Sequence, residues 1–95
     1  MGEGETERQR LDKWLWFARM ARTRTAAADL VAEGHVRVNS LRVTQAAKAI
    51  RPGDVLTVAL QRDVRVLRVL ALAARRGPFE AARLLYQDLA QPPPD

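Results

Sequence analysis

The chain has 95 residues, of which 47% are hydrophobic, so it can bury one core but is too short for a catalytic domain joined to a separate binding domain. It has no cysteine and one histidine, which excludes disulfides, thiol nucleophiles and metal clusters built on Cys or His. It also lacks the apolar run of a membrane span or signal peptide, so we expect a cytoplasmic protein. The formal net charge of +5 favours a polyanionic partner.

The two ends of the chain are expected to be tails on a single domain. Residues 1–8 are small and polar without periodicity, which predicts a flexible tail. Residues 91–95 carry three consecutive prolines, which cannot continue a helix. We therefore expect one folded domain over residues 9–90 that ends in a helix and is followed by a Pro-rich tail.

Two helices are predicted at the start of this domain. The first is expected over residues 11–21, where one apolar stripe has helical spacing: Leu11, Trp14, Leu15, Ala18 and Ala21. Thr23 is a suitable N-cap for a second helix over residues 24–33, and Gly34 suits the left-handed residue that ends it. Because the link is short, the two helices must pack as a hairpin or a corner.

Alternating apolar residues then predict four strands. Residues 36–38 and 41–43 are joined at Asn39 and Ser40, where a tight turn needs positive φ and glycine is the usual second residue, so Ser40 predicts a longer or strained turn. A turn at residues 51–54 leads into a strand over residues 55–60. A return strand over residues 64–72 changes parity near Val66, which predicts either a bulge there or burial on both faces.

A third helix is predicted to begin at Gly77-Pro78, with proline in the first helical position. Its expected apolar side consists of Phe79, Ala82, Leu85, Tyr86 and Leu89. The predicted order is α-α-β-β-β-β-α. This order is typical of an α+β domain, with two N-terminal helices packed on a small, mainly antiparallel twisted sheet and a C-terminal helix.

Positive charge is concentrated in the body of the chain. Residues 8–76 hold 15 of the 16 basic side chains but five of the 11 acidic ones, a surplus of ten (15 minus 5). A GC-rich genome would explain arginine in place of lysine, but it does not explain the scarcity of acids in the same stretch. A compact body this positive is expected to attract a nucleic acid.

The basic residues fall into two groups. The first lies on the two helices and their link: Arg10, Lys13, Arg19, Arg22 and Arg24, with the Thr23 cap among them. Helix N-terminal amides and guanidinium forks together suit a phosphate, although a solvated helix face is the commoner role of surface charge. The second lies on the predicted hairpin and the loop after it: Arg37, Asn39, Arg42, Lys48 and Arg51. Asn39 is also a common turn former.

Other polar and aromatic residues are less informative. Arg62, Arg65, Arg68, Arg75 and Arg76 either extend the basic surface or keep an edge strand soluble. Trp14 is expected in the core and His35 in a structural role, while Trp16 and Phe17 either stack on a base or pack against the third helix. No Ser/His/Asp set, carboxylate pair or phosphate loop is present, so we expect no enzyme activity, no metal and no cofactor.

Three stretches together resemble the S-four RNA-binding domain, named after a ribosomal small-subunit protein. They are Arg10-Leu11-Asp12-Lys13-Trp14-Leu15-Trp16, Thr23-Arg24-Thr25-Ala26-Ala27 and Gly34-His35-Val36-Arg37-Val38-Asn39. The pattern of that domain is a basic first helix, a Ser/Thr-Arg-Ser/Thr helix start and a Gly-x-Val-x-Val-Asn-Gly hairpin, and residues 10–60 match it. Ser40 stands where the family has its second glycine. The Asp-Lys-Trp-Leu-Trp run and Arg75-Arg76-Gly77-Pro78 further resemble the fifteen-kilodalton heat-shock protein family.

The resemblance implies a protein that binds structured RNA on the large ribosomal subunit, including subunits blocked by a nascent chain. The RNA-contacting positions of the family map onto Arg10, Lys13, Arg22, Thr23, Arg24, Asn39 and Arg42. Lys48 and Arg51 are added from charge alone. We expect a monomer without membrane or small-molecule partners. Two other interpretations stay open: a DNA-binding regulator that uses the second helix for recognition, and an accessory RNA-binding module for an RNA-modifying enzyme on another chain.

Overall fold

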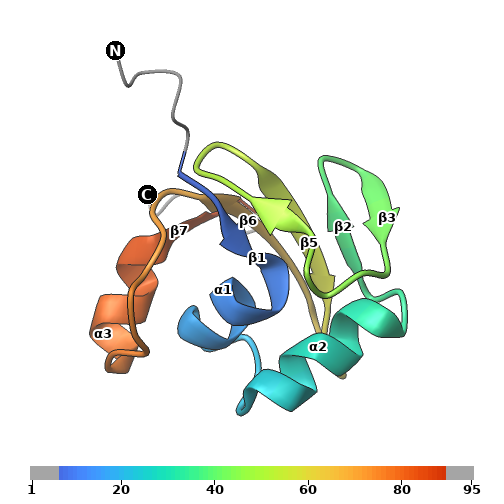
Figure 1. Ribbon diagram of the computed structural model, residues 1–95, viewed down its shortest axis with the longest axis horizontal. Helices are drawn as coiled ribbons and strands as arrows, with labels where there is room; N and C mark the ends of the chain where they lie inside the picture. Colours follow the sequence, from blue (N-terminus) through green and yellow to red (C-terminus); the bar gives the residue numbers. More distant parts are fainter. Residues whose placement is uncertain (1–6, 90–95) are drawn as a thin grey trace.

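The computed structural model describes residues 7–89, in which a twisted antiparallel sheet carries α1 and α2 on one face (Figure 1). The predicted α+β class is confirmed. Most of the predicted N-terminal tail, residues 1–8, and all of the predicted Pro-rich tail, residues 91–95, lie outside the described residues.

The main sheet has five antiparallel strands in the order β3-β2-β5-β6-β7. Their bounds are β2 Val36–Val38, β3 Leu41–Val43, β5 Val55–Ala59, β6 Val64–Val69 and β7 Tyr86–Asp88. The first four agree with the predicted strands, although β6 ends three residues earlier than expected. The predicted Asn39-Ser40 turn is a tight two-residue turn, because Asn39 and Ser40 both have positive φ, 51° and 75°.

A second, two-stranded sheet pairs β1 (Gln9–Arg10) with β4 (Ala49–Ile50). The sequence did not predict either strand, because two residues are too few for a visible alternation. The pairing continues into the first helix, where Leu11 N donates to the Lys48 carbonyl at 2.8 Å and Asp12 N to the Ala46 carbonyl at 3.1 Å. The loop after β3 therefore accepts amide hydrogens that the helix start would otherwise leave unpaired.

The first helix, α1, covers Leu11–Phe17 and is shorter than the predicted range of 11–21. Arg19 adopts a left-handed φ of 63° and ends it. The amides of Arg19 and Met20 donate to the carbonyls of Trp16 and Leu15, the 5→2 and 6→1 bonds of a Schellman motif. Glycine is the usual residue at this position, and its absence is why the apolar pattern alone predicted a longer helix.

The second helix, α2, covers Arg24–Ala32, close to the prediction. Thr23 caps it as expected, since its Oγ1 accepts a hydrogen bond from Ala26 N at 2.9 Å. Gly34 follows the helix with a left-handed φ of 83°, also as expected. The apolar side of α2 packs on the sheet through buried Ala27 and Val31.

The C-terminal helix is much shorter than predicted. The helix α3 covers only Phe79–Ala82, with Pro78 at its N-cap position, and a 3-10 turn, η2 (Arg83–Leu85), follows it. The chain then pairs with β6 as strand β7, so Tyr86 and its neighbours are extended where the apolar spacing predicted helix. Pairing with the free edge of β6 outweighs the local helical preference here.

The parity change in β6 is not caused by a bulge, because its register with β5 is continuous from Val55↔Arg68 to Ala59↔Val64. Leu67 and Val69 face the core, and Arg65 has the same parity. Arg65 is accommodated near the edge by Asp88 of β7, with Nη2–Oδ2 at 2.8 Å. Burial lowers the pKa of Arg65, but hydrogen bonds and charge from Asp88 and Tyr86 outweigh this, so the pKa is raised.

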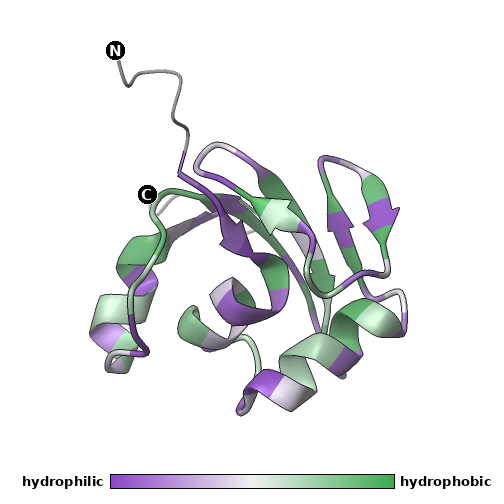
Figure 2. Cartoon of the chain, in the orientation of Figure 1, coloured by the Kyte–Doolittle hydropathy of each residue, from purple (hydrophilic) through white to green (hydrophobic). Residues whose placement is uncertain are grey.

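The core lies between α1, α2 and the inner face of the main sheet. Its largest fully buried side chains are Trp14, Leu11, Leu15, Ile50, Leu56 and Leu67. Trp14 is in the core as predicted, with its Nε1 donating to the Ala71 carbonyl at 2.9 Å. Around this core, strand β1 and the start of α2 are hydrophilic (Figure 2).

Candidate nucleic-acid interface

A buried carboxylate holds two arginines side by side at the start of α1. Asp12 is 3% exposed and accepts hydrogen bonds from Arg10, Nε to Oδ1 at 3.1 Å and Nη2 to Oδ2 at 3.0 Å. Arg24, at the start of α2, approaches the same Oδ2 at 3.7 Å. The hydrogen bonds to Asp12 and its charge raise the pKa of Arg10. Two guanidiniums thus share one acid, and both remain about half exposed, 52% and 44%.

The start of α2 adds backbone donors beside Arg24. Thr23 Oγ1 accepts a hydrogen bond from the Ala26 amide. The amides of Arg24 and Thr25 lie in the first turn and have no acceptor within the helix. Arg22, in the link between the helices, is exposed and has no ion pair among the described residues. Arg22, Thr23 and Arg24 therefore form one short cationic segment next to Asp12.

Asn39 fixes the tip of the β2–β3 hairpin to the turn before β5. Its Oδ1 accepts from Val55 N at 2.9 Å, and its Nδ2 donates to Asp54 Oδ1 at 3.1 Å. The other carboxylate oxygen of Asp54 accepts from Arg51 N at 3.1 Å. The alternative role of Asn39 as a turn former is thus present in the structure, and its predicted RNA contact stays a prediction.

Arg37 and Arg42 are directly opposite each other on β2 and β3. Both are exposed, on the side of the sheet away from buried Val36 and Val38. Arg42 also runs along Gly34, with its Cδ 3.5 Å from the place where a Cβ at position 34 would lie. Like charges in a cross-strand pair are destabilising, and neither guanidinium has an ion pair within residues 7–89.

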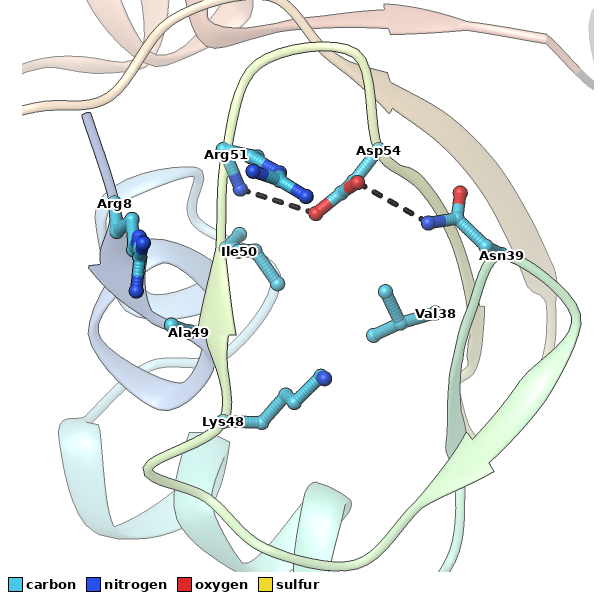
Figure 3. Close-up of a pocket in the computed structure, with 8 residues that line it drawn as sticks. All are labelled: Arg8, Val38, Asn39, Lys48, Ala49, Ile50, Arg51 and Asp54. Carbon is cyan, nitrogen blue, oxygen red and sulfur yellow. Dashed lines mark hydrogen bonds between the residues drawn. The ribbon is translucent and has the colours of Figure 1, made fainter. Parts of the chain in front are cut away.

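Two adjoining hollows lie between the hairpin and β4. The first, of about 320 Å³, is lined by Arg8, Val38, Asn39, Lys48, Ala49, Ile50, Arg51 and Asp54 (Figure 3). The second, of about 420 Å³, is lined by Val38, Asn39, Leu41, Arg42, Val43, Thr44, Gln45 and Lys48. They share Val38, Asn39 and Lys48, so together they form one groove, here called the hairpin groove. Asn39, Lys48 and Arg51 of the second predicted basic group thus line this groove, and Arg42 lines it at the edge strand β3, from the outer face that it shares with Arg37. Arg37 does not line it.

Arg10 connects the helical group to the hairpin groove. It pairs with Ala49 in the small sheet, and Ala49 and Lys48 line the first hollow. Arg8 precedes β1 and also lines the first hollow, while Gln9 between the two arginines donates to the Ala73 carbonyl at 2.7 Å. A band of basic residues therefore runs from Arg24 through Arg10 to the groove.

Two predicted residues lie apart from this band. Arg19 donates through Nε and Nη2 to the Gly77 carbonyl, at 3.1 and 2.9 Å, and so ties the end of α1 to the segment before α3. At about 1.5 Å per residue, the seven-residue α1 separates Arg19 from Asp12 by roughly 10 Å. Lys13 lies over the ring of Phe17, with Nζ 5.9 Å from the centroid. Their RNA contacts stay predictions.

Arg8 is the residue that sequence reasoning missed, since it was counted with the tail. The only signal was its place two residues before Arg10, and its position became clear only from the pairing of β1 with β4. In contrast, three arginines of the C-terminal half contact their own chain: Arg65 with Asp88, Arg68 with Gln87, and Arg76 with the carbonyls of Trp16 and Ala21.

Trp16 and Phe17, which the sequence left between base stacking and packing, both contact other side chains of the chain. Phe17 is 2% exposed, and its ring centroid lies 5.3 Å from that of Trp16. Trp16 is covered by Arg76, with Cζ 5.4 Å from the ring centroid. Within residues 7–89 there is no group of three acidic or histidine side chains that could hold a metal ion, and no helix is long and apolar enough to cross a membrane.

Comparison with known proteins gives a family for this arrangement. Residues 9–56, which contain α1, α2 and all of the groove lining except Arg8, match the S4 domain family. The chain is 39% identical over 83 residues to the heat shock protein 15 homolog of Aeromonas salmonicida, covering 87% of this chain and 62% of that protein. It is 34% identical over 83 residues to the small ribosomal subunit protein uS4 of Kosmotoga olearia, covering 78% of this chain and 40% of that protein.

A solved structure agrees with this relationship. Heat shock protein 15 of Vibrio cholerae, a trimeric structure, superposes with a TM-score of 0.82 at 32% identity, covering 88% of this chain and 84% of that one. The chain spans less than two thirds of the length of its curated heat shock protein 15 relatives. On these grounds the chain belongs to the S4 domain family and, within it, to the heat shock protein 15 group.

Proposed function

We propose that this chain is a non-enzymatic protein that binds structured ribosomal RNA through the basic band and the hairpin groove. One observation carries the proposal: Arg8, Arg42, Lys48 and Arg51 all line the groove, and none of them has an ion pair among the described residues. The one acid that lines it, Asp54, already accepts hydrogen bonds on both carboxylate oxygens. Uncompensated cations in a concave surface concentrate positive potential and attract polyanions.

The proposed mode of binding is recognition of RNA shape. Arginine forks bridge phosphate oxygens, and the deep, narrow major groove of helical RNA does not admit side chains that read bases. Arg10 and Arg24, both held near Asp12 Oδ2, present two guanidiniums to the RNA backbone. The large subunit as the binding site, and the rescue of blocked subunits, follow from the resemblance to the heat-shock family and are part of the proposal.

The proposal is tested by measuring affinity for ribosomal RNA as a function of salt. If about five phosphates are contacted, the log–log slope is expected to be roughly −3.5 to −4.5. Replacing Arg22 and Arg24 by alanine should weaken binding by about tenfold or more, because charge-assisted contacts to phosphate are lost. Affinity that does not change with salt would contradict the model.

R62A is a control at a position away from the proposed interface. Arg62 is exposed in the turn after β5, whereas the start of β5 adjoins the hairpin tip through the Asn39 N to Val55 O hydrogen bond. Five residues of strand separate the two ends by roughly 17 Å. R62A removes one positive charge away from the proposed interface and should change affinity by less than about twofold. Sedimentation of a tagged copy through a sucrose gradient then identifies the ribosomal particle that carries it.

The DNA-binding alternative is less well supported by the residues of α2. Its exposed side carries Asp29, and Glu33 follows at its C-cap, so a recognition helix in a major groove would bring carboxylates near phosphates. Competition between duplex DNA and folded RNA separates the two functions. The accessory-module alternative predicts that affinity purification of the tagged protein recovers an RNA-modifying enzyme in place of ribosomal subunits.

A single copy is the proposed binding unit, because every residue of the groove comes from residues 8–54 of one chain. The Vibrio cholerae relative is trimeric, so the oligomeric state of this chain needs its own measurement. Sedimentation equilibrium with and without RNA is expected to give one protein per RNA site. A trimer that persists at nanomolar protein would contradict the monomeric unit.

A further inference from the structure

The first hollow of the hairpin groove gathers three cations from the two segments that pair as β1 and β4. Arg8 precedes β1, Lys48 precedes β4 and Arg51 follows β4, so the short β1–β4 sheet brings them to one wall. Figure 3 shows Lys48 and Arg51 reaching from this wall towards Val38, Asn39 and Asp54 on the other side. All three cations are exposed, so none of them is part of the core.

The carboxylate in the hollow does not neutralise this wall. Asp54 accepts from the side-chain amide of Asn39 and from the backbone amide of Arg51, so its hydrogen bonds fasten the hairpin tip to the turn. No ion pair joins Asp54 to Arg8, Lys48 or Arg51 in the described part of the chain. Three cations thus share the hollow with one carboxylate, whose hydrogen bonds go to amide groups. The net charge of the residues that line the hollow is therefore positive.

The floor and size of the hollow limit what it can take. Val38, 6% exposed, forms an apolar floor next to fully buried Ile50, while the three cations line the hollow. A volume of about 320 Å³ is near the lower end for small-molecule sites, which begin at roughly 300 Å³. An anionic group with a small apolar neighbour suits this combination better than an extended strand of nucleotides.

We propose that this hollow is a seat for one RNA phosphate with its attached ribose, held by Arg8, Lys48 and Arg51. The phosphate oxygens accept charge-assisted hydrogen bonds from the three cations, and the ribose carbons lie against Val38. Arg8 is thereby assigned a ligand contact. This inference rests on the proposed function, since it names the chemical group that the groove selects from the RNA.

The test compares two triple variants of the full chain that lose the same charge. R8A/K48A/R51A empties the wall of the hollow, and R62A/R68A/R75A removes three exposed arginines that do not line it. We expect the first to weaken RNA binding by about tenfold more than the second and to lower the salt slope by a further 0.7 to 0.9, about one phosphate. Circular dichroism and thermal unfolding of both variants show whether each is folded.

Inorganic phosphate is a second probe that does not depend on RNA. In wild-type protein, millimolar phosphate should shift the backbone amide NMR signals of Ala49, Arg51 and Asp54, and the shifts should disappear in R8A/K48A/R51A. Equal losses of RNA affinity in both triple variants, with no phosphate-induced shifts, would overturn the seat while the salt-dependent binding of wild type still supported the proposed function. Absence of RNA binding by wild type would overturn the proposed function itself.

The phosphate has two possible sources in RNA, and two substrates distinguish them. We expect the seat to take an internal phosphodiester. In that case RNA without its 5′-phosphate should still bind R8A/K48A/R51A more weakly than R62A/R68A/R75A. If removal of the 5′-phosphate abolishes this difference in affinity, the seat takes a terminal phosphate. Both outcomes support a phosphate seat, and a lack of discrimination with either RNA overturns it.

Discussion

Arg37 and Arg42 face each other directly across the β2–β3 hairpin, so two positive side chains occupy one cross-strand pair. A fold optimised for stability alone would not keep such a pair, because opposed like charges are destabilising. We interpret the pair as a site where RNA phosphate supplies the missing negative charge. The pair is therefore expected to lower the stability of the fold while it strengthens RNA binding.

R37E should make the hairpin more stable and RNA binding weaker. An opposite-charge pair with Arg42 is expected to raise the free energy of unfolding by about 0.2–1 kcal/mol, measured by urea denaturation. The control is R68E, which makes the same charge change on the same face of the sheet, opposite Val55. A rise in stability that is equal in both variants would assign the effect to overall charge and not to the pair.

D12N should weaken RNA binding although it makes the protein more positive. The neutral amide no longer holds Arg10 and Arg24 by charge, while its oxygen can still accept from Lys13 N, now at 2.8 Å. We expect affinity to fall by about threefold to tenfold in titrations of labelled RNA. D29N, the same change on the exposed side of α2, should leave affinity unchanged or slightly higher. Tighter binding by folded D12N would exclude the positioning role.

S40G should stabilise the protein. Ser40 has a φ of 75°, which costs a residue with a side chain about 1 kcal/mol or more relative to glycine. Part of this gain is offset by the greater freedom of glycine in the unfolded chain, so we expect the free energy of unfolding to rise by about 0.5–1 kcal/mol. T44G is the control, because Thr44 lacks a positive φ and should gain nothing. A drop in the stability of S40G would contradict the turn assignment.

Leucine-to-alanine changes should distinguish core from surface in the main sheet. Leu56 is fully buried, and L56A is expected to lower the free energy of unfolding by about 2–5 kcal/mol through lost burial and an unfilled cavity. Leu41 is 72% exposed, so L41A should change it by less than about 0.5 kcal/mol. Similar losses in the two variants, measured by thermal unfolding, would show that the core is wrongly placed.

Signals within a few residues of one another were readable in the sequence. Thr23 caps α2 through the amide of Ala26, and Gly34 follows the C-cap of the same helix. The alternating residues of β2 and β3 are joined by a two-residue turn. The surplus of positive charge was readable too, because it needs only counting. These features indicated the α+β class and a nucleic-acid partner, and the family resemblance of the motifs indicated RNA.

Pairings between distant residues could be decided only by the tertiary structure. The β1–β4 pairing, the extension of Tyr86 into β7 and the diversion of Arg19 to the Gly77 carbonyl all join segments far apart in the chain. Such contacts depend on how the core closes and which strand edges remain free, and neither is encoded in local spacing. For the same reason, the sequence alone identified the basic residues, but only the fold selected those that share one groove and added Arg8 to them.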